Sequence, residues 1–372
     1  MRILAPVLTL FAATAAATAQ SSSDTLIKKD GSNLRGIEVL TFKLNEVKIK
    51  RGDKESDVPV HQVVAIEWGN VPDAFQAANA AMKRGDFAVA AEQFGDAANA
   101  ASRVLVKTDA RFLQAKAAVA AAASDPNAAT SAVGTLQAWV TEFPEHWRLP
   151  EALLLLGRAQ RMADLTAEAE QTLKDLSDRG GREGWGPIWS ARAKYELAQT
   201  LMAQDNALEA RGAFQSASAA ADTAMSGAGA DKAELRAIKI NSKVGEGETL
   251  LQEKNYQNAY DYFRRMASGD DPALAAAGKA GEGQALFLGA GPDALDDVRR
   301  AQIALAEASI LDAAAGEASA KANYFLGKCL LTLGREREGD SFQQRAEAYF
   351  RIVMRSYPNS SWAAAARQEL AK

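Results

Sequence analysis

The sequence predicts a mainly α-helical protein, an α-solenoid of about seven helical hairpins preceded by a small SH3-like β domain. Three observations support this prediction. An apolar pattern with helical spacing recurs along the chain, two longer segments are repeated within it, and strand signals are confined to residues 24–70. Stacked hairpins build their core by repetition, so the functional question concerns their surfaces more than a catalytic pocket.

The recurring pattern is a small residue, a large apolar residue four positions later and a further apolar residue three positions after that. Offsets of four and three place these side chains on one helix face, where the small residue lets a neighbouring helix approach closely. A period of about 35 to 49 residues is typical of stacked helical hairpins. The pattern occurs at Ala90-Phe94-Ala97, Ala132-Leu136-Trp139, Ala169-Leu173-Leu176, Ala210-Phe214-Ala217, Ala259-Phe263-Met266 and Ala346-Phe350-Val353.

Two direct internal matches support the repeat. The segment Gly245–Leu250 reappears as Gly281–Leu286, 36 residues later. The pairs Phe143-Pro144 and Tyr357-Pro358 are each followed by alanine and leucine at identical offsets. We therefore assign residues 72–372 to the helical repeat, which begins after the Val71-Pro72 boundary.

Residues 24–70 have a different period. Val47 and Ile49 alternate with charged residues, and Gly31 and Gly52 lie in turn sequences between short apolar runs. Such runs separated by turns predict four or five strands. A segment of this length makes only a small sheet, for which a curled SH3-like barrel is the expected form.

The first residues have the pattern of a signal peptide. Arg2 supplies a positive charge, an apolar and alanine-rich stretch covers residues 3–16, and Ala17-Thr18-Ala19 is a cleavage signal. We predict a signal peptide over residues 1–19 and an exported, soluble protein, periplasmic or secreted, that starts at Gln20. An ordinary N-terminal helix is the alternative. No later run reaches the roughly 18 to 20 apolar residues that span a bilayer.

Composition and charge argue against several classes of function. The chain has 43 Lys and Arg residues against 47 Asp and Glu residues, a formal net charge of −4. No general attraction to nucleic acid is expected from this balance. The single cysteine, Cys329, lies in an apolar helical run and is predicted to be a small buried core residue.

No set of residues predicts catalysis or metal binding. The two histidines, His61 and His146, have no partner at metal-ligand spacing, and His146 is interpreted as a surface residue beside Trp147. Gly245 and Gly247 are not followed by a phosphate-binding lysine and are interpreted as helix-packing residues. We therefore predict a protein that is not an enzyme and that holds no metal and no cofactor.

The helical region resembles the tetratricopeptide repeat (TPR) family. That family has a Gly or Ala in the first helix of each repeat, small-aromatic-small positions in the second, and often a proline after it. Residues that match the first and last features are Gly157, Gly247, Gly283, Gly327, Pro144 and Pro358. The family's first-helix tryptophan is absent, hairpin six lacks the aromatic and has Arg299 near that place, and hairpin seven has an insertion near residues 335–343. The chain's ending, with Tyr357-Pro358, is also similar to cell-envelope members of the family.

The resemblance implies a protein or peptide partner in the cell envelope, bound on the concave surface made by successive first helices. The chain would then be a non-catalytic scaffold or adaptor. Its oligomeric state is not predicted. By analogy with the family's groove positions, the candidate partner-binding residues are Phe75, Asn79, Arg158, Arg161, Tyr195, Gln199, Tyr324 and Lys328.

An alternative function is glycan binding, or service as an accessory subunit of an envelope enzyme or assembly machine. Its distinguishing feature is Trp185, which lies between two glycines in the segment Gly180–Pro187. This segment is expected to be a loop that exposes the indole ring.

Overall fold

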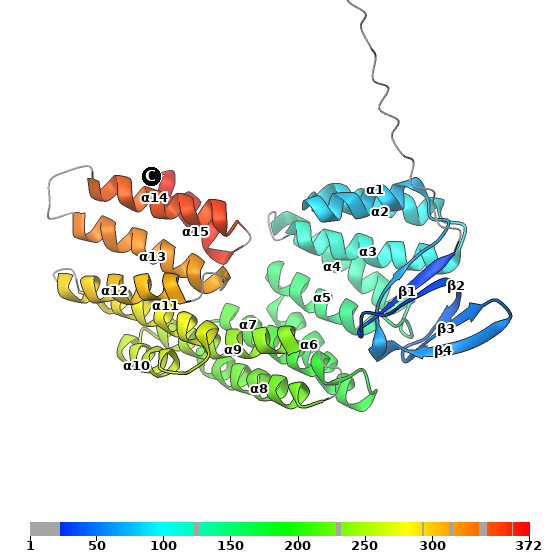
Figure 1. The fold of residues 1–372 in the computed structure, drawn as a ribbon, viewed down its shortest axis with the longest axis horizontal. Helices are drawn as coiled ribbons and strands as arrows, with labels where there is room; N and C mark the ends of the chain where they lie inside the picture. The colour runs from blue at the N-terminus through cyan, green and yellow to red at the C-terminus, as the bar shows by residue number, and fades with distance from the viewer. Residues whose placement is uncertain are drawn as a thin grey trace, which may run out of the picture.

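The computed structural model describes residues 23–122, 126–227, 232–291, 294–311, 316–334, 341–358 and 360–372. The predicted signal peptide lies outside these residues, as does most of the insertion expected near residues 335–343. The described residues form an N-terminal β domain followed by helical hairpins (Figure 1). The predicted fold class is confirmed.

The β domain is a five-stranded antiparallel sheet with the strand order β4-β3-β2-β1-β5. The long strand β2 pairs with β1 through its first half and with β3 through its second half, so it is shared by both parts of the curled sheet. A short 3-10 helix precedes β5. The strands are β1 (Asp24–Lys28), β2 (Asn33–Phe42), β3 (Glu46–Arg51), β4 (Lys54–Pro59) and β5 (Val63–Glu67).

Fourteen of the described helices form seven antiparallel hairpins, and α15 follows the last of them. The bounds are α1 (Asp73–Arg84) with α2 (Phe87–Ala100), α3 (Val104–Ala122) with α4 (Pro126–Glu142), α5 (Leu149–Met162) with α6 (Thr166–Arg182), α7 (Pro187–Ala203) with α8 (Ala207–Met225), α9 (Lys232–Gln252) with α10 (Tyr256–Ala267), α11 (Pro272–Gly289) with α12 (Leu295–Leu311), α13 (Gly316–Gly334) with α14 (Ser341–Ser356), and α15 (Ser361–Leu370). In Figure 1, α1 to α5 and α11 to α15 form two arms that rise from a base of α6 to α10.

The recurring apolar pattern forms the core of the solenoid. All six predicted triplets lie on second helices and are buried. In four of the triplets, the large residue packs against a first-helix glycine, a position that has no side chain. A Cβ atom placed on Gly157 would lie 2.7 Å from the Leu173 side chain, and one on Gly327 would lie 2.5 Å from Phe350. Glycine is therefore required where two helices approach this closely.

Hairpin six lacks the aromatic, as predicted, but it keeps the buried apolar triplet. The buried residues Ala301, Leu305 and Ala308 occupy the triplet positions, and Leu305 packs against Gly283. Arg299 instead lies on the surface, where its guanidinium pairs with Asp296 at 2.6 Å. Leu305 thus takes the central position, as Leu136 and Leu173 do in two other triplets, and Arg299 does not occupy it.

The β domain and the first hairpin share one hydrophobic core. Buried residues of the sheet, such as Val39 and Ile49, belong to the same cluster as Phe75 and Phe94. The rings of Phe75 and Phe94 are in edge contact, with centroids 5.5 Å apart. The sheet is thus packed on the solenoid rather than tethered to it.

Buried polar groups fix the position of the β domain. The carboxylate of Asp24 in β1 accepts hydrogen bonds from the backbone N–H groups of Val39 and Gly69, at 2.9 Å each. It also accepts two from the Arg103 guanidinium, at 2.8 Å each. Burial raises the pKa of Asp24, but the hydrogen bonds from Arg103, Val39 and Gly69 outweigh this effect and the pKa is lowered.

A second buried carboxylate joins the β domain to two helices. Asp109 in α3 accepts a hydrogen bond from Trp68 Nε1 at 2.8 Å and another from Arg148 Nε at 2.6 Å. The Asp109 and Arg148 side chains are both buried. A buried charge must be paired in this way, because an isolated one is costly.

His146 is buried, contrary to the prediction of a surface residue. Its ring lies against Phe42 of the β domain, with centroids 4.2 Å apart, and against Trp139, with centroids 4.9 Å apart. Its Nδ1 atom accepts a hydrogen bond from the Arg148 backbone N–H. Rings of both the β domain and the helical region thus cover this histidine.

The segment Gly180–Pro187 is only partly a loop. Helix α6 continues through Gly180 and Gly181 and ends at Arg182. The backbone then turns at Gly184 and Gly186, whose φ angles of 71° and 101° favour glycine. The two latter glycines thus make the connection to α7.

Candidate functional site

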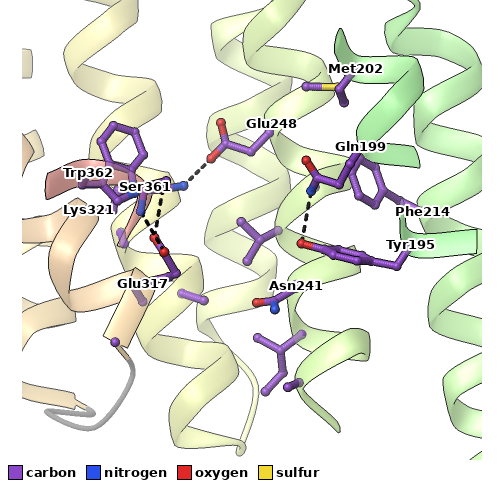
Figure 2. Close-up of a pocket in the computed structure, with 18 of the residues that line it drawn as sticks. Tyr195, Gln199, Met202, Phe214, Asn241, Glu248, Glu317, Lys321, Ser361 and Trp362 are labelled. Atoms are coloured by element: carbon purple, nitrogen blue, oxygen red, sulfur yellow. Dashed lines mark hydrogen bonds and ion pairs between the residues drawn. The ribbon is translucent and has the colours of Figure 1, made fainter. Parts of the chain in front are cut away.

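The inner face of the solenoid contains a groove of about 830 Å³. Its lining comes from the first helices α5, α7, α9, α11 and α13, with contributions from α8 and the start of α15. Figure 2 shows the groove with α7 on one side and α13 and α15 on the other. The groove lies where the resemblance predicted a concave binding surface.

The first wall of the groove is made by α7 and the end of α5. Tyr195 and Gln199 are one helical turn apart on α7, and Gln199 Nε2 donates to the Tyr195 hydroxyl oxygen at 3.1 Å. The Tyr195 hydroxyl is neutral at physiological pH, and burial raises its pKa above the ordinary value of 10. It therefore remains available as a hydrogen-bond donor toward the groove.

In the first wall, two arginines of α5 share one carboxylate of α7. Arg158 Nε donates to Glu196 Oε1 at 2.7 Å, and Arg161 Nη2 donates to Glu196 Oε2 at 3.0 Å. The Glu196 side chain is buried, whereas the arginines are partly exposed. The cluster has a net charge of +1, and the buried Nε of Arg161 has no hydrogen-bond partner.

The opposite wall is made by α13 and α15. Lys321 pairs with Glu248 of α9, two first helices away, and its ammonium group lies 5.6 Å from the centre of the Trp362 ring. Glu317 accepts hydrogen bonds from the backbone N–H and the hydroxyl of Ser361, at 3.0 Å each. These contacts hold the start of α15 against the groove (Figure 2).

Between the walls, the groove has an alanine-rich floor on α9 and α11. Its side chains are small or aliphatic apart from Asn241, whose amide is exposed. Two neighbouring first helices thus supply a floor of mostly small and aliphatic side chains. The alanine-rich floor consists of Ala237, Ile240, Asn241, Val244, Ala273, Ala277 and Ala280.

Three of the predicted site residues line the groove, namely Arg161, Tyr195 and Gln199. Arg158 adjoins them through Glu196. The four come from α5 and α7, the first helices of hairpins three and four.

The other four predicted residues do not line this groove. Phe75 is buried against Phe94, so its prediction as a binding residue is wrong. Asn79 is exposed on α1, away from the groove lining. Tyr324 contacts the Trp362 ring behind the second wall. Lys328 pairs with Glu369 at 2.9 Å and lines a separate hollow of about 700 Å³.

Sequence reasoning missed Asn241, Glu248, Lys321 and Trp362, which all line the groove. The repeat positions used for hairpins three and four were not applied to hairpins five and six. Applying them would have pointed to α9 and α11. The position of Trp362 had no such signal, because α15 belongs to no complete hairpin.

Trp185 is buried, which corrects the prediction on which the glycan-binding alternative depended. Only 6% of the residue is exposed. The Arg179 guanidinium lies 4.8 Å from the centre of the indole ring, and Leu44 of the β domain packs against the same apolar cluster. The ring is therefore unavailable for stacking on a sugar.

Within the described residues, no group of three or more His, Cys, Asp and Glu side chains could hold a metal ion. No helix in the same residues has the length and apolar character needed to cross a bilayer. Cys329 is buried as predicted, and burial raises its pKa to about 12. A neutral buried thiol is a packing residue rather than a nucleophile.

No family model and no curated protein matches the sequence. Among solved structures, the apo form of RapI is 10% identical, with a TM-score of 0.49 over 80% of this chain and 84% of that one. A Rap protein complexed with Competence and Sporulation Factor is 14% identical, with a TM-score of 0.42 over 80% of this chain and 74% of that one. The C-terminal part of a TPR repeat-containing protein from Cytophaga hutchinsonii is 12% identical, with a TM-score of 0.40 over 78% of this chain and 98% of that one. At such identities, these likenesses concern the helical-repeat fold alone.

Proposed function

We propose that this protein is an exported, non-catalytic scaffold that binds a protein or peptide partner in its concave groove. The single observation that carries the proposal is the groove itself, in which an apolar floor is flanked by two walls of polar and aromatic side chains. Concave surfaces of this kind are how helical-repeat proteins present a large contact area to a partner. Export rests on the signal-peptide pattern of residues 1–19.

The composition of the groove favours a polypeptide over a small metabolite. The groove is long and crosses several helices, whereas pockets for small molecules enclose most of their ligand. Its walls provide separated polar groups, including Tyr195, Gln199 and Lys321, which suit a ligand with many side chains.

The proposal can be tested by site-specific photo-crosslinking in the native cell. A photoreactive amino acid replaces Asn241 in the floor or, as a control, Ala219, which is exposed on α8 outside the groove lining. We expect one or a few discrete protein adducts from position 241, recovered from the cell envelope, and none of these from position 219. Equal adduct patterns at both positions would contradict the proposed binding surface. Adducts confined to cytoplasmic proteins would contradict export.

A further inference from the structure

We infer that the partner occupies the groove as an amphipathic α-helix, with acidic residues along the side that faces α5 and α7. The inference rests on the proposed function, because it assigns the form of the ligand at the same site. Three properties of the groove support it: the width of the floor, its scarcity of hydrogen-bonding groups, and the charge of one wall.

The floor has the width of a helix. The uncharged part of the lining runs from Ala237 to Gly245 on α9, where Glu248 follows it, and from Ala273 to Ala280 on α11. At a rise of 1.5 Å per residue, these stretches are about 12 Å and about 10 Å long. A helix with its side chains is about 10–12 Å across, whereas neighbouring strands are only about 4.8 Å apart. A single extended chain would leave much of the floor uncovered.

The floor offers few partners for an exposed backbone. An extended peptide brings unpaired N–H and C=O groups into the groove, and such groups are costly when they are buried without partners. Asn241 is the only side chain of the alanine-rich floor that can form hydrogen bonds. A helix satisfies its own backbone groups, so it can cover an apolar floor without this cost.

The small floor residues also permit close contact. Ala237, Ala273 and Ala277 let a ligand helix approach the backbones of α9 and α11, while Ile240 and Val244 supply aliphatic surface. A ligand helix that packs on this floor needs apolar residues spaced three and four positions apart, because these lie on one face. The distance from α7 to α13 is about three interhelical steps of 8–10 Å, which corresponds to a helix of roughly 16 to 20 residues.

The charge of the first wall sets the orientation of the ligand's polar side. Arg158 and Arg161 share the single carboxylate of Glu196, so this wall has a net charge of +1. On the opposite wall, Lys321 is matched by Glu248, and Glu317 adds a negative charge. Acidic side chains therefore fit against α5 and α7, and they would meet repulsion from Glu317 on the other side.

The test uses two phage-displayed libraries of 18-residue peptides selected against the full-length exported chain. The first library is built on a helix-forming backbone, and the second has a proline at every fifth position, which prevents a regular helix. The variant Ala237→Trp fills the floor at an exposed position. The matched control, Ala219→Trp, makes the same change on the exposed face of α8.

We expect binders from the first library, with affinity reduced at least tenfold by Ala237→Trp and unchanged by Ala219→Trp. Their helicity should rise on binding, measured by circular dichroism, and a central proline should abolish binding. Replacing their acidic residues by glutamine should weaken binding to the native chain but have little effect on the Arg161→Gln variant. Binders from the proline library that depend on Ala237 would overturn the helical ligand and leave the proposed function intact. Binders indifferent to Ala237→Trp, or no binders at all, would count against both.

Discussion

Gly247 of α9 receives the ring of Phe263 from α10 at a position where any side chain would clash with the ring. Phe263 is the central residue of its buried triplet, and its ring also fills the space beside Gly281 of the next hairpin. One aromatic side chain thus joins two successive repeats. The repeated Gly-Glu-Gly sequence at residues 245–247 and 281–283 is the mark of this packing in the sequence.

The first prediction concerns this contact. Gly247→Ala should destabilise the protein by about 1–3 kcal/mol, because the added methyl group overpacks the site against Phe263. Gly212 is the matched control, since it is exposed in α8 and an added Cβ atom would meet nothing within 4 Å. Gly212→Ala should stabilise the helix by about 0.5–1 kcal/mol. Chemical denaturation checks both values, and equal effects of the two changes would contradict the assigned packing.

The second prediction concerns His146 and pH. Burial, and secondly the charge of Arg148, lower the pKa of His146 from 6.5 to about 3. The unfolded chain binds a proton near pH 6.5, whereas the folded chain does not, so the stability is fully present above pH 6.5 and is lost as the pH falls. Between pH 6.5 and 5, the free energy of unfolding should decrease by up to about 1.4 kcal/mol per pH unit from this group.

The two histidines of the chain provide the variants for this test. His146→Phe keeps an aromatic ring among Phe42, Trp139 and Trp147 and should flatten the pH dependence between pH 6.5 and 5. His61→Gln changes an exposed residue and should leave the slope as it is. If the His146→Phe variant kept the same pH dependence of the free energy of unfolding, groups other than His146 would be its cause.

The third prediction concerns the attachment of the β domain. Asp24→Asn removes the charge that pairs with Arg103, so it should destabilise the protein by about 3 kcal/mol. Because the pKa of Asp24 is lowered, its contribution is present above its ordinary value of 3.8 and is lost as the pH falls through the folded pKa. Hydrogen exchange in β1 and β2 should accelerate more than in α9. Asp57→Asn, an exposed change on β4, is the control and should have no measurable effect.

The parts of the fold that sequence could predict are those set by local spacing. The triplet Ala210-Phe214-Ala217 is buried as predicted, because offsets of four and three define one helix face whatever packs against it. The strands around Val47 and Ile49 follow from alternation in the same way. These signals depend only on residues that are close together in the sequence. They can therefore be read from the sequence without knowledge of the fold.

The errors concern surfaces that distant segments cover. Trp185 lies between glycines and was expected to be exposed, but Leu44 of the β domain packs against its apolar cluster. Phe42 covers His146 for the same reason. Phe75 was assigned to the groove from repeat positions, although the first hairpin shares its core with the sheet. None of these contacts has a signal in local periodicity, because each joins residues on separate elements.

The fourth prediction concerns the single thiol. With its pKa raised to about 12, Cys329 has a thiolate fraction at pH 8 that is roughly a thousandfold smaller than that of an ordinary cysteine. A disulfide reagent should therefore modify native protein only when hairpin seven opens, and it should react at once in denaturant. Fast, stoichiometric labelling of the native protein would contradict the buried position.

The last prediction concerns Arg158 and Arg161. Exchanging both for glutamate surrounds the buried carboxylate of Glu196 with two more negative charges and removes its partners. This double variant should lose roughly 3 kcal/mol of stability, because an unpaired buried charge is costly. Adding Glu196→Lys restores opposite charges and should recover most of the loss, as measured by denaturation. A triple variant no more stable than the double one would show that the cluster does not act through charge pairing. The triple variant also reverses the net charge of the first wall while keeping the fold and the alanine-rich floor. It should therefore lose the binding of acidic helical ligands, although the surface for their apolar face is unchanged.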